Sequence, residues 1–454
     1  MPKATLILPS LNVGGYIEEC LESVRCQSLE DIEILCIDAG STDGTYEILR
    51  EHAAADSRIR LIRSQVRSYG YQVNLGFSMA RGEYVGIVET DDSIEPDMYE
   101  TLCRVATEEG LDYAKGGFYT MATPCEGERY LLEHPLPDTG RLLSHTYYTD
   151  SPLSPDVYIW NGVYRRAFLE RNRIRLNESP GAAFQDCGLR YLTDMNLERG
   201  MFIDRLLYRY RRDNAASSTY DPRFARFNLQ ECRYIRARMD EQGMRDRARR
   251  AFMARESVMM ALSPYMTYRE HSRPDEAIRR DMEEMRQMIC RDREAGLLAR
   301  REMHPDLYLE MRLFTENPEA YEAYAGIRAG INSSIYGDFV REMKEKNQIV
   351  LCCAGKAAKF ALCLMRMNGL GNIVCVCDNN SALWGGTYHG REVVGLQEAV
   401  QRYPKAHYLV TNRACPEEIL KQLKGYGIRE ENMSAYTLPL QAFGSTNLFM
   451  RDMD

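Results

Sequence analysis

The run from Gly82 to Asp92, Gly-Glu-Tyr-Val-Gly-Ile-Val-Glu-Thr-Asp-Asp, limits what this chain can fold into more than any other segment. Its apolar part, residues 84–88, predicts a buried strand, and three carboxylates, Glu89, Asp91 and Asp92, follow at once. Because unpaired carboxylates are costly to bury, they indicate a strand end that opens onto a crevice, where oxygen ligands can hold a divalent cation. A solvated acidic turn is the alternative that this segment leaves open by itself.

Strands and helices alternate along the N-terminal part of the chain. The expected strands are 4–9, 32–37, 59–62 and 84–88, and the expected helices lie over 16–27, over 44–49 and from about Tyr69 onward. Alternation at this pitch predicts an α/β fold with a mostly parallel, doubly wound sheet. Ligands of such sheets bind outside the carboxyl ends of the strands, so the residues that directly follow the strands are the candidates for a binding site.

A series of short motifs runs in order through residues 3–220. They are Leu8–Asn12, Asp38–Gly44, Asn74–Tyr84, Glu89–Asp92, Ile159–Arg166, Phe184–Asp186, Leu207–Arg211 and Ser217–Thr219. Each motif alone is a weak signal, but their order and spacing together are specific. Together they resemble the nucleotide-sugar domain of the inverting family 2 glycosyltransferases, which have the GT-A fold.

The resemblance implies a nucleoside diphosphate sugar as donor, with uridine as the expected nucleoside, and Mn²⁺ or Mg²⁺ as a Lewis acid on the diphosphate. Asp91 is the expected main metal ligand, with Asp92 beside it and Glu89 directed to the ribose or a metal-bound water. Asp38 is expected to accept a hydrogen bond from the uracil or the ribose. The remaining residues expected on the donor side are Pro9, Leu11 and Asn12, which flank the base, and Asn74.

Asp186 matches the position of the family's catalytic base. An inverting transfer needs a base that takes the proton of the acceptor hydroxyl as it attacks. The alternative is an N-cap, because aspartate suits the start of the helix expected over 187–195. Both can hold at once, since a cap position also fixes the carboxylate.

Trp160 and Arg211 each have two interpretations. The indole of Trp160 offers an apolar surface for a sugar ring, or it is a core tryptophan. Arg211, with Arg209 and Arg212, would close over the diphosphate through bidentate contacts, or these arginines form the outward side of a strand whose tyrosines point inward. The loop with Ser217 and Ser218 is expected to be a lid that orders over the donor.

Two positions depart from the family pattern. Ala39 stands where a second aspartate is usual, and Glu89 stands where an aspartate is usual, so these departures bear on the choice of donor rather than on the reaction class. These departures are also the best support for a different class of protein. That class is a nucleotide-sugar or glycan-binding scaffold that has lost turnover.

Composition excludes several other classes. The net charge of -8 gives no reason to expect nucleic acid as a partner, and the 14 cysteines show no metal-like spacing. We therefore expect a reducing, cytoplasmic location without disulfides. The N-terminus enters a strand almost at once, which predicts no signal peptide, and no apolar run approaches the ~20 residues that span a bilayer.

Residues 221–346 have helical periodicity and are rich in Arg, Glu and Met, which predicts a helical connector or bundle. Pro264 and Pro274 predict that it contains more than one helix. The stretch from Arg223 to Arg255 is basic. It either lies against anionic lipid at the inner face of the membrane or a phosphorylated carrier, or it is a solvated helix face with local ion pairs, which is the favoured interpretation.

Residues 347–440 return to an α/β pattern and resemble the small Rossmann-like domains of some bacterial sugar-processing enzymes. Asp378 lies near the spacing of a ribose-binding acid, but Cys353 and Ala358 occupy two expected glycine positions. Nucleotide binding and a structural or oligomerising role both stay open. A nicotinamide-dependent enzyme that works through this domain is the third function class, and residues 441–454 are expected to be a tail.

The sequence as a whole favours an inverting, metal-dependent glycosyltransferase. It would move a sugar, most simply from a uridine diphosphate sugar, to a hydroxyl of a carbohydrate or lipid-linked glycan. The family context is polysaccharide or glycolipid assembly, with the protein in the cytoplasm or peripheral to the inner face of the cell membrane.

Overall fold

The computed structural model describes residues 1–122, 130–151, 158–212, 214, 223–271, 273–367 and 370–437. The expected lid residues Ser217 and Ser218 and the expected tail 441–454 lie outside these ranges. Contacts divide the chain into two compact units, Met1–Thr120 with Glu133–Ala325, and Met121–Leu132 with Gly326–Asp454.

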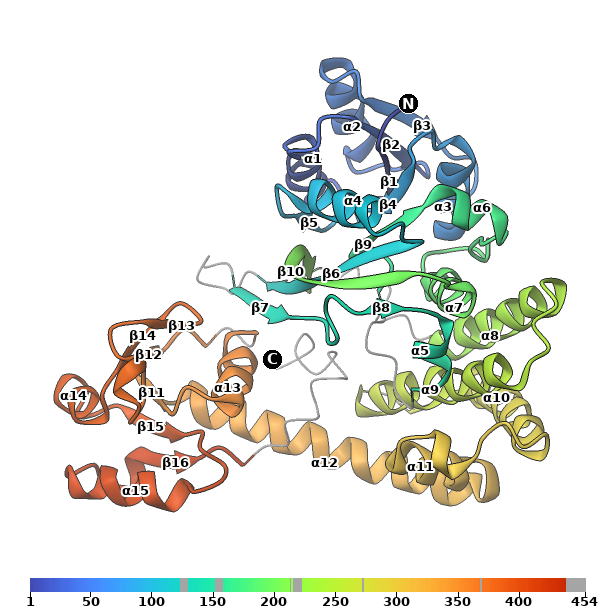
Figure 1. Ribbon diagram of the computed structural model, residues 1–454. Coiled ribbons are helices and arrows are strands. Elements are labelled where there is room, and N and C mark those ends of the chain that lie inside the picture. The colour runs from blue at the N-terminus through green and yellow to red at the C-terminus, as the bar shows by residue number, and fades with distance from the viewer. Residues whose placement is uncertain are drawn as a thin grey trace. The chain divides into compact units, whose positions relative to one another are not determined.

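A mixed sheet of ten strands organises the N-terminal part (Figure 1), in the order β3-β2-β1-β4-β9-β6-β10-β5, with β7 beside β6 and β8 beside β10. The strands are β1 (Ala4–Ser10), β2 (Ile32–Asp38), β3 (Ile59–Arg63), β4 (Tyr84–Ile87), β5 (Ser93–Ile94), β6 (Tyr113–Ala122), β7 (Tyr130–His134), β8 (Leu142–Leu143), β9 (Gly162–Arg165) and β10 (Gly200–Arg211). Strands β1 to β4 are parallel, as expected. The expectation of a mostly parallel sheet is wrong beyond β4, because β9 runs antiparallel to β4 and to β6, and β10 antiparallel to β5.

Helices cover both faces of this sheet. They are α1 (Ile17–Arg25), α2 (Thr45–Ala55), α3 (Tyr69–Met79), α4 (Met98–Glu108), α5 (His145–Thr149), α6 (Arg166–Arg171) and α7 (Asp186–Asn196). Alternate residues of β1 enter different cores, because successive side chains of a strand point to opposite faces. Ile7 packs in the cluster that contains Val73 of α3, whereas Leu6 packs in the cluster that contains Leu21 of α1.

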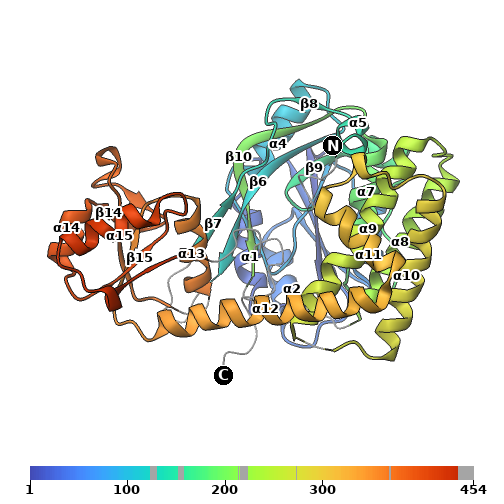
Figure 2. The same cartoon turned by 90° about the horizontal axis from the view of Figure 1, so that it is seen from below.

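A group of helices follows the sheet, and both views show α8 to α11 side by side (Figures 1 and 2). The helices are α8 (Phe224–Glu241), α9 (Arg247–His271), α10 (Glu276–Glu294), α11 (Pro305–Glu316) and the longer α12 (Pro318–Lys344). Pro274 precedes α10 as expected, but Pro264 lies inside α9, where it does not end the helix. The neighbouring side chains Leu262 and Tyr265 are buried, so packing holds the turn in which proline removes a backbone donor.

The basic stretch of α8 and α9 shows the ion pairs that one of its two interpretations expects. The pairs are Arg233 with Glu284, Arg236 with Asp292, Arg238 with Glu241, Arg247 with Glu302, Arg249 with Asp246 and Arg250 with Asp240. Most of its arginine charge is therefore balanced within the protein. Across the described residues, we find no helix whose length and apolarity would let it cross a membrane.

The second unit contains a smaller sheet in the order β13-β14-β12-β11-β15-β16. Its elements are β11 (Ile349–Cys352), α13 (Lys356–Met367), β12 (Ile373–Cys377), β13 (Thr387–Tyr388), β14 (Arg391–Val394), α14 (Leu396–Arg402), β15 (His407–Val410), α15 (Pro416–Gly425) and β16 (Met433–Ala435). All neighbouring strands are parallel except β13. The expected fold class, an α/β domain followed by helices and a smaller α/β domain, is confirmed.

Asp378, the acid expected to bind a ribose, forms hydrogen bonds within this unit. The carboxylate of Asp378 accepts the amide of Ala354 across 2.7 Å and the amide of Asn380 across 2.8 Å. Cys353, at an expected glycine position, has a φ of 77°, which glycine adopts more readily. Asp378 therefore joins the loops after β11 and β12, and nucleotide binding by this unit stays a prediction.

Candidate active site

The carboxyl ends of β1, β2 and β4 meet at one edge of the sheet, because these strands are parallel and in register. Ser10 pairs with Asp38, and Ile7 pairs with Ile87, two residues before Glu89. The hydroxyl of Thr90 donates to the carbonyl oxygen of Pro9 across 2.8 Å and joins two of the three loops.

Asp92 is almost fully buried, with 1% of its surface exposed. Its carboxylate accepts the hydroxyl of Tyr208 across 2.8 Å and the amide of Arg211 across 2.7 Å. Burial and the charge of Asp91 raise the pKa of Asp92 well above its ordinary value. Strand β10 therefore supplies the partners that hold this carboxylate in place.

Asp91 is half-buried and lies beside the end of β10. Its carboxylate accepts the side-chain amide of Asn214 across 2.7 Å, and its carbonyl oxygen accepts Nε of Arg211 across 2.8 Å. The Arg211 guanidinium also forms an ion pair of 2.7 Å with Glu19 of α1. The structure thus brings Arg211 to the acidic strand end, but a diphosphate would share this cation with Glu19.

Glu89 is held by two tyrosines. Its carboxylate accepts the hydroxyl of Tyr69 across 2.5 Å, and its amide donates to the hydroxyl of Tyr208 across 3.0 Å. Burial raises the pKa of Glu89 to about 8, and the charges of Asp91 and Asp186 add to the rise while the Tyr69 hydrogen bond opposes it. Glu89 therefore lies within electrostatic reach of Asp186.

The expected nucleoside-binding residues form the loops after β1 and β2. The buried carboxylate of Asp38 accepts the amides of Gly40 and Ser41 across 2.9 and 3.1 Å. Asn12, with a φ of 54°, accepts the amide of Thr42 across 2.9 Å. These bonds fix the two loops against each other, and Leu11 is 37% exposed at their surface. Contact with a nucleoside stays a prediction for Pro9, Leu11, Asn12 and Asp38.

Asp186 is the first residue of α7 rather than its N-cap, which is Gln185. Phe184, directly before this pair, has a φ of 65°, an uncommon conformation for a bulky residue. The amide group of Gln185 donates to the carbonyl oxygens of Ser179 and Gly181 and closes the turn. Burial raises the pKa of Asp186, and the Cys187 amide and Arg190 offset only part of the rise.

Asn74 lies on α3 with its side chain engaged by the segment that leads to Asp186. Its amide group donates to the carbonyl oxygen of Leu176 and to Glu178, each across 2.9 Å, and it accepts the Leu176 amide across 3.0 Å. Asn74 therefore anchors this segment to α3. Direct contact with a substrate stays a prediction.

Trp160 has the position that its core interpretation expects. It is 5% exposed, and its ring stacks on Tyr208 with centroids 4.1 Å apart and on Tyr158 with centroids 4.5 Å apart. The indole supports the tyrosine that holds Asp92. Contact of Trp160 with a sugar stays a prediction.

The acidic strand end fits a divalent cation held by few side chains. Three carboxyl groups lie within four residues, and a cation at Asp91 would favour their ionised forms, with substrate phosphates as further ligands. Both oxygens of Asp92 already accept hydrogen bonds, so its role as a direct ligand stays a prediction. Among the described residues, a group of three ligand side chains within 4.8 Å occurs at Glu18, Glu22 and His52, but there Arg25 already bonds Glu22 and His52.

Sequence reasoning missed four side chains of this site: Tyr69, Tyr208, Asn214 and Glu19. For Tyr208 the sequence did offer a signal, namely the interpretation in which the tyrosines of the Leu207–Arg211 motif point inward. Glu19 and Asn214 offered none, because their partners are 192 and 123 residues away in the chain.

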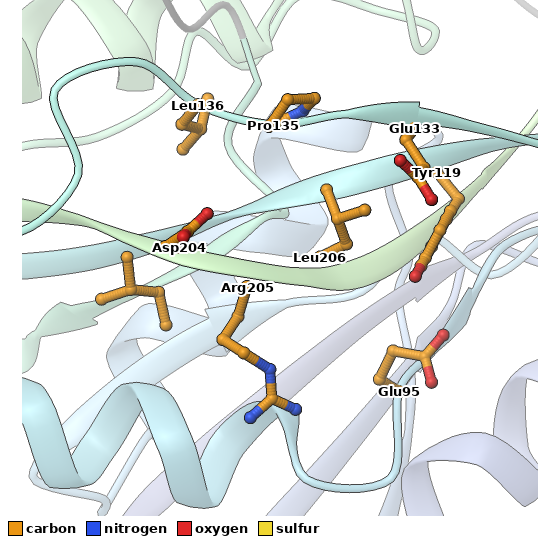
Figure 3. A pocket seen from close by; sticks show the side chains of 9 residues that line it. Glu95, Tyr119, Glu133, Pro135, Leu136, Asp204, Arg205 and Leu206 are labelled. Carbon is orange, nitrogen blue, oxygen red and sulfur yellow. The ribbon is translucent and has the colours of Figure 1, made fainter. Parts of the chain in front are cut away.

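A polar cavity of about 450 Å³ lies beside β10, outside the group of predicted site residues (Figure 3). Its lining consists of Glu95, Tyr119, Glu133, Pro135, Leu136, Ile203, Asp204, Arg205 and Leu206. Two of these residues form ion pairs with side chains outside the lining, Glu95 with Arg209 and Arg205 with Asp97.

Comparison with known proteins finds relatives of this chain. Residues 5–172 match the model of the family described as glycosyl transferase family 2. The uncharacterized glycosyltransferase EpsJ of Bacillus subtilis (strain 168) is 31% identical over 230 residues, 49% of this chain and 64% of that protein. Chondroitin synthase of Escherichia coli is 38% identical over 103 residues, 23% of this chain and 15% of that protein. The chain spans less than two thirds of the length of these relatives.

A solved structure shares the fold. The crystal structure of S. aureus TarS, residues 1–349, in complex with UDP matches with a TM-score of 0.51 at 16% sequence identity. The match covers 71% of this chain and 89% of that one.

Proposed function

The N-terminal domain of this chain belongs to glycosyl transferase family 2, with a GT-A fold, and from this premise we propose that the protein is an inverting, metal-dependent glycosyltransferase. It would move a sugar from a nucleoside diphosphate donor to a hydroxyl of a carbohydrate or lipid-linked glycan. A uridine diphosphate sugar is the proposed donor, since the relative of similar fold was solved with UDP.

One observation carries the proposal: Tyr69 joins the acidic strand end to the segment that bears Asp186. Its hydroxyl bonds Glu89 across 2.5 Å, and its amide bonds Gly181 across 2.8 Å, five residues before Asp186. The proposed metal-binding strand end and the segment of the proposed base are therefore linked through one residue. A transfer with inversion requires both groups at one site, because the leaving group and the attacking hydroxyl occupy opposite faces of the sugar.

The proposed donor side is built from the loops after β1, β2 and β4. Asp38, Pro9, Leu11 and Asn12 would bind the nucleoside, and Glu89 the ribose. Asp91 would hold Mn²⁺ or Mg²⁺, which when bound neutralises charge on the departing diphosphate. Arg211 would add a guanidinium contact to a phosphate, while Asp92 keeps the loop and β10 together.

The proposed acceptor side is built around Asp186. Its ionised carboxylate would take the proton of the acceptor hydroxyl as that oxygen bonds the anomeric carbon and the bond from carbon to diphosphate oxygen breaks. A carbohydrate acceptor is favoured because a relative with 38% identity is a chondroitin synthase. Polysaccharide or glycolipid assembly, in the cytoplasm or at the inner face of the membrane, is the proposed context.

A donor screen tests this function. Nucleoside diphosphate sugars would be incubated with the protein, a panel of oligosaccharide acceptors and Mn²⁺ or Mg²⁺, and release of the nucleoside diphosphate would be followed. We expect release that requires the metal and increases with a suitable acceptor. Tight donor binding without release would instead favour a scaffold that has lost turnover, and no binding at all would contradict both.

A further inference from the structure

Tyr69 lies at the first turn of α3, where the chain enters the helix from an extended residue. Ser68 is the N-cap, and its hydroxyl accepts the amide of Tyr71 across 3.2 Å. A side-chain cap of this kind fixes the start of a helix. The backbone from which the Tyr69 side chain extends is therefore held in place.

The hydroxyl of Tyr69, from α3, also contacts the acidic strand end that β10 holds. It donates to Glu89 across 2.5 Å, whereas β10 holds the Glu89 amide and the Asp92 carboxylate through Tyr208. Glu89 occupies a position where the family pattern has aspartate, whose carboxylate is one methylene nearer to the backbone. The longer side chain and the phenol are thus complementary in this protein.

The backbone of Tyr69 contacts the segment that bears Asp186. The Tyr69 amide donates to the carbonyl oxygen of Gly181 across 2.8 Å, and the Gly181 amide donates to Arg67 across 3.0 Å. The same carbonyl of Gly181 accepts the side-chain amide of Gln185 across 3.2 Å, next to Asp186. Hydrogen bonds from the two ends of Tyr69 therefore link Glu89, through the covalent frame of Tyr69, to the Gly181 carbonyl that also binds Gln185, the residue before Asp186.

We propose that Tyr69 is a positioning residue of the transferase site: it fixes the Glu89 carboxylate for donor binding and couples that carboxylate to the turn that holds Asp186. This inference rests on the proposed function and adds a residue to it. Because the hydroxyl acts through Glu89, the two side chains form one unit. The effects of changing either one are not independent.

A double-mutant cycle with UDP and Mn²⁺ as the probe tests the unit. Tyr69→Phe removes only the hydroxyl, and Glu89→Asp withdraws the carboxylate from it. An ordinary hydrogen bond accounts for about 2- to 10-fold in an equilibrium constant, so each change should weaken UDP binding several-fold, up to about 10-fold, in calorimetry. The double variant should bind no more weakly than the weaker single variant.

Tyr71→Phe is the matched control, since Tyr71 is a half-buried tyrosine of the same helical turn. It should leave UDP affinity within about twofold of the wild type, because surface and half-exposed substitutions usually have small effects. Thermal unfolding of all variants separates lost folding from lost positioning. Effects of Tyr69→Phe and Glu89→Asp that multiply, or a Tyr69→Phe variant that binds UDP like the wild type, overturn the proposal.

Kinetics with a donor from the screen give a second readout. The hydroxyl bond to Glu89 anchors the residue whose backbone amide holds Gly181, so losing that anchor in Tyr69→Phe should lower kcat as well as raise the donor KM. A purely structural loss would lower the active fraction and leave KM unchanged. An unchanged kcat and KM would contradict the coupling to Asp186. Wild-type protein that neither binds UDP nor releases it contradicts the proposed function itself, which distinguishes the two failures.

Discussion

The hydroxyl of Tyr208 donates to the Asp92 carboxylate across 2.8 Å, and the same oxygen accepts the Glu89 amide across 3.0 Å. Tyr208→Phe would remove both bonds and leave a buried carboxylate short of one donor. We expect the free energy of unfolding to fall by about 1–3 kcal/mol and UDP affinity with Mn²⁺ to fall as the acidic loop loosens. Urea denaturation and calorimetry measure the two effects, and unchanged values in both would contradict the role given to β10.

Asp91→Ala should abolish the increase in UDP affinity that Mn²⁺ produces, because it removes the half-buried carboxylate proposed to hold the cation. Calorimetric titration of UDP with and without Mn²⁺ measures this increase. Asp31→Ala is the control, since Asp31 is exposed in the same domain. A variant at Asp91 that still responds to Mn²⁺ would place the cation elsewhere.

Asp186→Asn should keep donor affinity and lose transfer, because asparagine preserves size but cannot take a proton. General bases contribute about 10²- to 10⁴-fold to rates, so kcat should fall by a factor in this range. Burial raises the pKa of Asp186, so wild-type kcat/KM should fall, as the pH is lowered, at a higher pH than the ordinary aspartate pKa of about 4. Full activity in the variant would reassign the base.

Glu33→Gln should destabilise the first domain. The buried Glu33 carboxylate bonds Arg60, Arg81 and the hydroxyl of Thr5. Burial opposes its ionisation, but these bonds lower its pKa below the ordinary value. Its stabilising effect is therefore present above the unfolded pKa of about 4 and is lost as the pH falls through the lower folded value.

Urea denaturation at two pH values measures this effect. We expect Glu33→Gln to cost about 1–3 kcal/mol near neutral pH and the difference from the wild type to shrink in acid. A difference that stays the same at every pH would show that shape rather than charge makes Glu33 important.

Gly70→Ala should separate α3 from the segment that leads to Asp186. An added Cβ would lie 1.9 Å from the backbone oxygen of Asn177, so the segment would have to move. Overpacking of this kind costs about 1–3 kcal/mol. Gly15→Ala is the control, since a Cβ there meets nothing within 4 Å. Equal melting temperatures for the two variants would contradict the close approach.

The first half of the site could be predicted because it depends on local patterns. Each of the first four strands is an apolar run that ends in polar residues, and parallel pairing then forces Asp38 and the Glu89–Asp92 group to one edge. The motif at Phe184–Asp186 located the proposed base, although one residue away from the expected cap position. None of this required knowledge of distant contacts.

The other half depends on pairings between distant segments. The antiparallel strands after β4 and the ion pair between Glu19 and Arg211 join parts of the chain that no periodicity relates. Trp160 shows why the environment of a single residue could not be predicted. One of the two tyrosines that stack on it, Tyr208, lies on strand β10, far from Trp160 in the sequence, and the other is Tyr158. Pro264 shows that packing can override a local helix breaker.

The crowded interior side of α3 has a practical consequence for directed evolution. Gly70 leaves no room for a methyl group, and Gly76 leaves little, because an added Cβ would meet the Ile7 side chain at 2.7 Å. Libraries that seek new donor preferences would lose most members if they randomised this helix. Diversity is better placed at exposed loop positions such as Leu11 and Thr42, which can vary without disturbing the scaffold.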